Sequence, residues 1–201
     1  MIKRQFNENA KRNMMALVQG VLIILPFDAM ARIQYRYERI GEGKFTDIKT
    51  PVVTSIPYIL TVNIDWYESA DEYDVKLMLR HEARHLYQQN QIEKLSLGKP
   101  VAEDANMILQ WDNEFIPDNY VSNMPGKERE HFTQACEIDA YVFASFICNT
   151  ETIRDDGSCS LSIVQYPFIG DIVEQRVIHM LHTTPMENLQ KYRDLYSRQK
   201  V

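Results

Sequence analysis

The chain has 201 residues, of which 45% are hydrophobic and 25% charged, and this composition is typical of a globular protein with a hydrophobic core. The length fits a single domain over residues 1–201. The net charge of −6 disfavours a general nucleic-acid-binding surface, which needs a basic stripe, so we expect no nucleic-acid partner.

Cysteine usage bears on the compartment. The three cysteines, Cys136, Cys148 and Cys159, are odd in number and form no C-x-x-C pair. This pattern is typical of reduced thiols, and we therefore expect a cytoplasmic protein.

The N-terminal region has some features of a secretory signal. Basic residues precede the uncharged residues 13–27, and a small-x-small sequence follows at residues 29–31. However, Glu8 lies before the uncharged stretch, Gln19 lies within it, and the stretch is too short to span a bilayer. We expect a buried helix or strand here and no membrane segment, with secretion as the alternative.

Hydrophobic periodicity predicts a helix and then strands in the first third of the chain. Residues 9–18 suit a helix, whereas residues 21–37 fit either a helix or a strand. Apolar and polar side chains alternate over residues 58–66, which predicts a strand with one apolar face. Pro51 and Pro57 bracket a short run, so any strand between them is expected at a sheet edge.

A long helix is predicted next. Ser69-Ala70-Asp71-Glu72 forms an S-x-x-E capping box, which indicates the start of a helix that extends to about residue 90. Its faces comprise a core stripe, a solvated basic stripe and a third face open to a cleft. The core stripe is Val75, Leu79, Ala83 and Leu86, the basic stripe is Lys76, Arg80 and Arg84, and the third face is Met78, His81, Glu82 and His85.

The remainder of the chain is predicted to be mainly helical. Four further helices are expected near residues 101–111, 127–148, 169–181 and 185–199. Residues 152–165 are expected to form a loop or hairpin. The last helix has Thr184 as its expected N-cap, Pro185 at its first position and Glu187 completing a capping box.

Residues 81–85 read His-Glu-Ala-Arg-His, an H-E-x-x-H motif. On a helix, His81 and His85 lie on one face about one turn apart, where two ring nitrogens can hold a zinc ion. Glu82, one residue round the helix, reaches a water bound to the same metal. The alternative is a polar helix face with ordinary surface histidines.

A catalytic zinc site normally has three protein ligands, and Glu137 is the best third candidate. It lies 52 residues after His85, on a separate predicted helix with an otherwise apolar face. A carboxylate in such a place is costly unless a cation or hydrogen bonds compensate it. Alternatively, Glu137 is a salt-bridge partner, for instance of Arg84. Three other residues near it could then serve as the ligand: Glu130, His131 and Asp139.

H-E-x-x-H followed by E-x-D-A-x-x-F-A at residues 137–144 resembles the gluzincin-type zincin metallopeptidases. The similarity is greatest to the small bacterial and phage-associated ImmA/IrrE-like zinc peptidases. It covers about residues 57–90 and 128–148, roughly a quarter of the chain. Thermolysin-like enzymes carry an aspartate four residues after the glutamate ligand, whereas this chain has Tyr141 there and Asp139 two residues earlier. The partner that orients a ligand histidine is therefore unassigned.

The resemblance implies that His81, His85 and Glu137 hold one zinc ion and that Glu82 is the general base. It also implies an α+β, zincin-like fold, mainly helical, with a small sheet packed beside the H-E-x-x-H helix. In such a fold the strand at residues 58–66 would offer an edge to an extended peptide.

The expected function is zinc-dependent hydrolysis of peptide bonds, with a specific protein as the substrate. Zinc would polarise the scissile carbonyl and activate water, while Glu82 transfers the proton to the leaving amine. The oxyanion needs a further donor, for which Tyr141, His179 and His182 are candidates.

Two other functions remain open. One is a non-catalytic metal-binding domain with a regulatory or interaction role. The other is a non-haem iron enzyme, because two histidines and one carboxylate also form its facial triad. Replacing Glu82 by Gln separates an enzyme from a binding module, since only the enzyme should lose turnover while keeping its metal.

Overall fold

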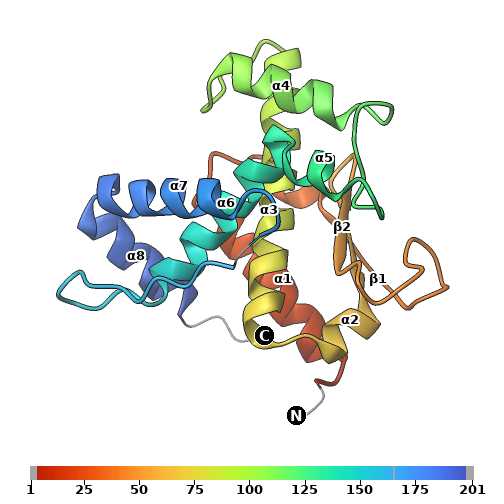
Figure 1. Ribbon diagram of the computed structural model, residues 1–201, viewed down its shortest axis with the longest axis horizontal. Coiled ribbons are helices and arrows are strands. Elements are labelled where there is room, and N and C mark those ends of the chain that lie inside the picture. The colour runs from red at the N-terminus through yellow and green to blue at the C-terminus, as the bar shows by residue number, and fades with distance from the viewer. Residues whose placement is uncertain (1–3, 165, 198–201) are drawn as a thin grey trace. The chain divides into compact units, whose positions relative to one another are not determined.

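The structure is a computed structural model that describes residues 4–164 and 166–197 (Figure 1). In the described part, the protein is α+β and mainly helical, with one three-stranded mixed sheet, which confirms the predicted α+β class, whereas the zincin-like fold stays a prediction. The described residues form two compact units, residues 4–89 and residues 90–164 with 166–197. The single domain expected from the sequence stays a prediction.

The first unit begins with helix α1, Glu8–Leu22. The side chain of Asn7 accepts a hydrogen bond from the Ala10 N–H at 3.0 Å and so caps the helix. One face of α1 is buried, through Ala10, Met14, Leu17, Val18, Val21 and Leu22. The helix predicted over residues 9–18 is therefore confirmed and is longer than expected. The ambiguous residues 21–37 contain the end of α1, a 3-10 turn (Met30–Arg32) and most of strand β1.

The sheet of the first unit consists of β1 (Gln34–Glu38), β2 (Val52–Ser55) and β3 (Ile59–Asn63) in the order β1-β3-β2. Strand β1 is parallel to β3, with Gln34 opposite Ile59. Strand β2 is antiparallel to β3, with Val52 opposite Val62. Strand β2 thus lies at an edge, as the flanking prolines predict.

The strand predicted over residues 58–66 is shorter than expected and is not an edge. It ends at Asn63, whose side chain accepts hydrogen bonds from the N–H groups of Asp65 and Trp66. These bonds cap a short helix, α2 (Ile64–Ser69), which takes up the rest of the alternating segment. Because β3 pairs on both sides, it cannot add an extended peptide, and this expectation was wrong.

Helix α3, Glu72–Ser96, carries the H-E-x-x-H motif. Its start is capped by Asp71, which accepts a hydrogen bond from the Asp74 N–H at 2.8 Å. The predicted cap, Ser69, instead ends α2, where its hydroxyl donates to the carbonyls of Asp65 and Trp66. The helix also continues beyond residue 90 and is followed by Gly98, whose φ of +64° is readily adopted only by glycine.

The middle of α3 is buried on all sides, because every residue from 79 to 91 is buried. The predicted solvated stripe was wrong, since Arg80 and Arg84 are 0% and 6% exposed. Arginine can pack its planar head against aromatic rings, and the Arg84 guanidinium lies 4.5 Å from the centre of the Tyr87 ring. The expected cleft face was also wrong, as His81, Glu82 and His85 are buried. A helix covered all round lies in a core.

The second unit is helical in its described residues. Its helices after α3 are α4 (Ala105–Phe115), α5 (Glu128–Phe132), α6 (Ala135–Thr150), α7 (Gly170–Thr183) and α8 (Met186–Tyr196). Helix α6 is buried from residue 140 to residue 150 and packs against α4, α7 and α8. Ile108, Trp111 and Cys136 form a fully buried cluster between α4 and α6. The core of this unit therefore surrounds α6.

Several boundaries in the second unit differ from the prediction. Residues 127–148 form two helices, because the Thr133 hydroxyl donates to the Arg129 carbonyl and α6 starts afresh after Gln134. No side-chain hydrogen bond caps α8, so the predicted cap by Thr184 and Glu187 was wrong. Residues 152–164 contain no helix or strand, as expected, whereas residues 165 and 199 lie outside the described residues.

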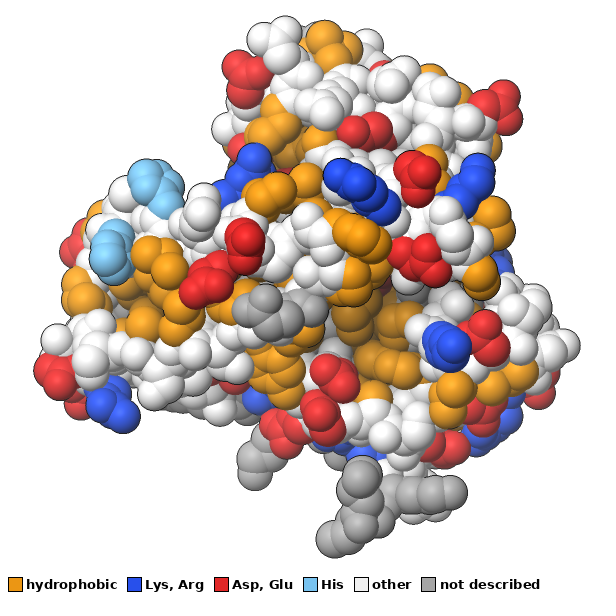
Figure 2. All heavy atoms as spheres, viewed as in Figure 1, with side chains coloured by type: hydrophobic (Ala, Val, Ile, Leu, Met, Phe, Trp, Pro, Cys, Tyr) orange, Lys and Arg blue, Asp and Glu red, His pale blue; other side chains and the backbone are white. Residues whose placement is uncertain are grey.

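Basic and acidic side chains are interspersed on the face of the molecule shown in Figure 2. Of the helices described, none combines the length and the apolar character needed to cross a membrane.

Candidate metal centre

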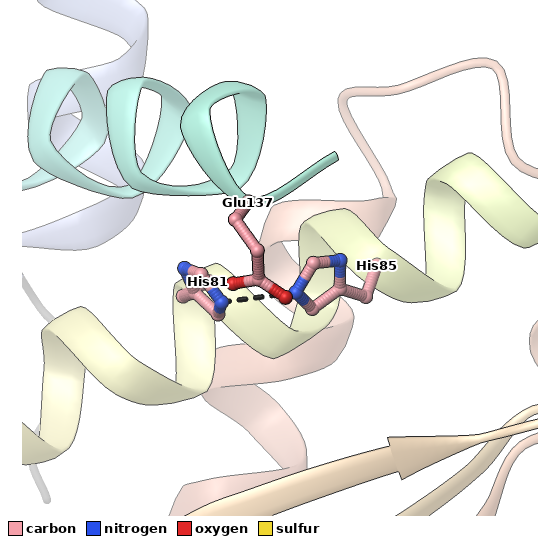
Figure 3. Close-up of side chains that lie close together, drawn as sticks. All are labelled: His81, His85 and Glu137. Atoms are coloured by element: carbon pink, nitrogen blue, oxygen red, sulfur yellow. Dashed lines mark hydrogen bonds between the residues drawn. The ribbon is translucent and has the colours of Figure 1, made fainter. Parts of the chain in front are cut away.

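The two motif histidines face each other on successive turns of α3 (Figure 3). Nε2 of His81 and Nε2 of His85 lie 2.9 Å apart, and the ring planes are nearly perpendicular at 87°. The two residues are 2% and 5% exposed. The helical spacing of four residues therefore brings the same nitrogen of each ring to one buried point, as the motif predicts.

Gln88 orients the second of these rings. Its Oε1 lies 2.8 Å from Nδ1 of His85, and because an amide oxygen only accepts, Nδ1 carries the proton. With Nδ1 protonated, Nε2 of neutral His85 holds a lone pair, and it lies 2.9 Å from Nε2 of His81. A metal ion held by both Nε2 atoms requires both to be unprotonated. Gln88 is thus the orienting partner that the sequence left unassigned.

Glu137 is the third residue of α6 and is 1% exposed. Its negative charge lies in the first turn, where the helix dipole favours it. The Tyr120 hydroxyl donates a hydrogen bond to Oε1 at 2.9 Å, and Nε2 of His131 lies 3.8 Å from Oε2. The carboxylate is therefore buried with polar partners from its own unit.

The ligand atoms of His81, His85 and Glu137 all lie within 4.8 Å of one another (Figure 3). Zinc binds such atoms at about 2.0–2.2 Å, so two ligands of a tetrahedral site lie about 3.3 Å apart. Two imidazole nitrogens and one carboxylate oxygen are a donor set of catalytic zinc sites and also of non-haem iron sites. The three residues therefore form a buried group that could hold a metal ion.

Cys136 precedes Glu137 and lies in the buried cluster with Ile108 and Trp111. Burial raises the pKa of its thiol, and the Glu137 and Glu114 carboxylates raise it further. Both effects favour the protonated thiol, and Cys136 is not part of the His-His-Glu group found among the described residues.

Glu82 lies between the two histidines in sequence and is 6% exposed. Its backbone carbonyl accepts a hydrogen bond from the Thr54 hydroxyl of β2 at 3.4 Å. This contact ties the edge strand to the motif. The role of Glu82 as a general base stays a prediction.

The alternative ligands lie in different settings. Glu130 is exposed and Asp139 half-buried, whereas His131 is buried beside Glu137. A salt bridge of Glu137 with Arg84 also stays a prediction.

None of the three expected oxyanion donors belongs to the His-His-Glu group found among the described residues. Tyr141 is buried, with its ring centre 4.3 Å from that of Tyr166. His179 and His182 are exposed on α7. Their role in stabilising an oxyanion stays a prediction.

Sequence reasoning missed three residues that hold the site together: Gln88, Tyr120 and Glu114. Gln88 could have been found from the sequence, because it lies three residues after His85 and residues at this spacing are neighbours on a helix. Tyr120 and Glu114 could not have been found in this way, since each contacts α6 across an irregular connection.

Searches against protein-family models, curated proteins and solved structures found no match to this chain. The fold and the site define an α+β protein with a buried His-His-Glu group that could hold a metal ion.

Proposed function

We propose that this protein is a zinc metallopeptidase that hydrolyses peptide bonds in a specific protein substrate. The observation that carries the proposal is the approach of the His81, His85 and Glu137 ligand atoms to within 4.8 Å of one another. The resemblance of the H-E-x-x-H…E pattern to gluzincins of the ImmA/IrrE kind supports it from the sequence.

Each residue has a defined task in this proposal. His81, His85 and Glu137 hold the ion, and Gln88 keeps His85 in the tautomer that offers Nε2. Bound zinc would polarise the scissile carbonyl and lower the pKa of water. Glu82 takes the proton of the attacking water and delivers it to the leaving amine.

The choice of zinc hydrolysis over iron chemistry rests on Glu82. A facial iron triad needs only the two histidines and the carboxylate. A glutamate directly after the first histidine adds a base on the same helix, which hydrolysis requires and the iron triad does not.

Strand β2 is the sheet edge that we propose for the substrate. It is an edge strand, and Thr54 on it bonds to the backbone of Glu82. An extended peptide that pairs with β2 would therefore run beside the residue that we assign as the base. β2 takes over the role that the sequence suggested for residues 58–66.

We also propose a cytoplasmic location, which fits three cysteines that form no disulfide in the described part of the chain.

A non-catalytic metal-binding domain is the second candidate, and burial favours it. Glu82 and the three ligands are only 1–6% exposed, so a substrate has little access to them in this conformation. Burial of this kind suits a metal that supports the structure, whereas the set of three protein ligands, which leaves one coordination position for water or substrate, suits catalysis.

Replacing Glu82 by Gln separates the two candidates. Zinc-loaded wild type and Glu82→Gln are incubated with a peptide library from a whole-proteome digest, and new N-termini are counted by mass spectrometry. Zinc content is measured on the same samples. A lost general base should lower cleavage by roughly 10²- to 10⁴-fold without loss of zinc.

The outcomes distinguish the candidates. Cleavage by wild type but not by the variant, at equal zinc content, supports the peptidase. Equal cleavage by both proteins overturns the role of Glu82. Zinc binding without cleavage by either protein favours the non-catalytic domain.

A further inference from the structure

We infer that Tyr120 is a positioning residue for the metal centre, which fixes the Glu137 carboxylate through its hydroxyl. The connection between α4 and α5, which contains Tyr120, fixes the position of this residue. The inference rests on the proposed metal site and goes beyond it, because it assigns a role to a region that the motif does not include.

The contact itself is a hydrogen bond from the Tyr120 hydroxyl to Oε1 of Glu137 at 2.9 Å. A bond from a hydroxyl to a carboxylate is stronger than one between neutral groups. The terminal torsion of a glutamate is broad, so the carboxylate plane is poorly fixed by the side chain alone. The Tyr120 hydroxyl therefore sets the direction in which Glu137 presents its oxygens.

The residue that follows Tyr120 is fixed by two buried side chains. The amide of Gln134 accepts from the Val121 N–H at 2.9 Å and donates to the Val121 carbonyl at 3.1 Å. Nδ1 of His131 donates to the same carbonyl at 2.9 Å. Gln134 and His131 are 8% and 7% exposed, so these bonds are largely shielded from water.

The other side of the connection is held by α4. The Tyr120 N–H donates to the Ile116 carbonyl at 2.9 Å, and the Asn119 side chain donates to the Asn113 carbonyl at 3.0 Å. Tyr120 is thus the end of a loop fixed on both sides, which is what a positioning residue needs.

Helix α4 also fixes the start of α6. The Glu114 carboxylate accepts from the N–H groups of Ala135 and Cys136 at 3.0 and 2.8 Å. These two groups are among the N–H groups that a helix start leaves without intrahelical partners. Helix α4 and its connection therefore fix both the backbone of the Glu137 segment and, through Tyr120, its carboxylate.

His131 does not take this role. Its Nδ1 proton is directed to the Val121 carbonyl, and its Nε2 lies 3.8 Å from Glu137, beyond hydrogen-bonding distance. Instead, its ring lies edge to face with the Tyr120 ring, with centres 6.1 Å apart at 85°. This contact supports the tyrosine ring.

Tyr120→Phe tests the inference, because it removes only the hydroxyl and keeps the ring against His131. Zinc affinity is measured by competition with a chromogenic chelator, and cobalt(II) binding by visible absorption, which reports the geometry of the ligands. Loss of a partner that orients a metal ligand typically costs about 10- to 100-fold in metal affinity. We expect a loss in that range and a changed cobalt spectrum.

Tyr192→Phe is the matched control. It makes the same chemical change in the same unit, on α8, where the ring packs against Phe146. We expect wild-type zinc affinity and a wild-type cobalt spectrum. Thermal unfolding of both metal-free variants shows whether they fold.

A second variant, Gln134→Leu, removes both amide contacts to Val121 and leaves Tyr120 and Glu137 unchanged. We expect weaker zinc binding, in the same direction as for Tyr120→Phe. Wild-type zinc affinity and an unchanged cobalt spectrum in Tyr120→Phe would overturn the inference, whatever Gln134→Leu shows.

Failure of the inference differs from failure of the proposed function. If wild type binds neither zinc nor cobalt, the metal site itself is wrong, and the inference falls with it. If wild type binds zinc and Tyr120→Phe binds it equally well, only the positioning role is wrong.

Discussion

His85 and Gln88 are joined by a 2.8 Å hydrogen bond between Nδ1 and Oε1 on neighbouring turns of α3. Both residues are buried, so the bond is protected from competing water. It determines which nitrogen of His85 faces His81. A motif read only for its two histidines and its glutamate leaves out this fourth residue.

Removal of the Gln88 amide should therefore weaken metal binding. In Gln88→Leu, Nδ1–H of His85 loses its acceptor, and we expect zinc affinity to fall by roughly 10- to 100-fold. A competition titration with a chelator measures the change. Gln175→Leu, on the exposed face of α7, should bind zinc like wild type. Equal affinities in the two variants would contradict the orienting role.

Metal binding should stabilise the fold. The three ligands are 1–5% exposed, so an ion bound to them binds the folded state in preference to the unfolded one. At a free zinc concentration 100 times the dissociation constant, the gain is about 2.7 kcal/mol. We expect the unfolding midpoint to rise with zinc and to fall with a chelator. In His81→Ala, neither addition should shift it.

The cap of the motif helix can be tested by comparing two neighbouring residues. Asp71 accepts a hydrogen bond from the Asp74 N–H, whereas Ser69 bonds within the preceding helix. Asp71→Ala should lower the free energy of unfolding by about 1 kcal/mol. Ser69→Ala, an exposed change, should stay within about 0.5 kcal/mol of wild type. Urea denaturation of both variants measures the two free energies of unfolding. A larger loss in Ser69→Ala than in Asp71→Ala would support Ser69 as the cap, as the sequence suggested.

Alkaline pH should destabilise the first unit through Tyr37. Burial raises the pKa of its hydroxyl to about 12, and the Glu8 carboxylate adds to this effect. The folded state thus holds the proton more tightly than the unfolded state, whose tyrosine titrates near 10. The resulting stability is complete below pH 10 and is lost as the pH rises toward 12.

Urea unfolding at a series of pH values measures this loss. The unfolding free energy of wild type should fall more steeply than that of Tyr37→Phe between about pH 10 and 12. The difference between the two proteins should stay constant from about pH 6 to 8, since tyrosine is protonated throughout that range. Parallel curves above pH 10 would contradict the prediction. Burial also raises the pKa of Tyr35, so Tyr35→Phe should act in the same direction.

Local patterns predicted the elements of the fold better than their ends. The period of apolar residues identified α1 and α3, and Pro51 and Pro57 correctly placed β2 at an edge. The same reasoning extended β3 through Trp66, because alternation cannot show that the Asn63 side chain starts a helix there. It also placed Arg80 in solvent, since burial of a charged residue depends on tertiary packing.

The candidate site was also predicted only in part. Helical spacing predicted that His81 and His85 would face each other, and the apolar face around Glu137 made it the best third candidate, in agreement with the resemblance; the structure places the three together. The partners of Glu137 could not be predicted. Tyr120 precedes it by 17 residues, across a connection whose path depends on hydrogen bonds to Val121. Sequence periodicity does not describe such contacts.

The three thiols provide a natural probe of local opening. Cys159 is exposed and should react at once with an alkylating reagent, whereas Cys136 and Cys148 are buried and should react only when α6 opens. Because Cys136 adjoins Glu137, its labelling rate would report how often the start of that helix loosens. The same alkylation experiment, followed by mass spectrometry, would thus measure the dynamics of the segment that carries the carboxylate without any introduced label.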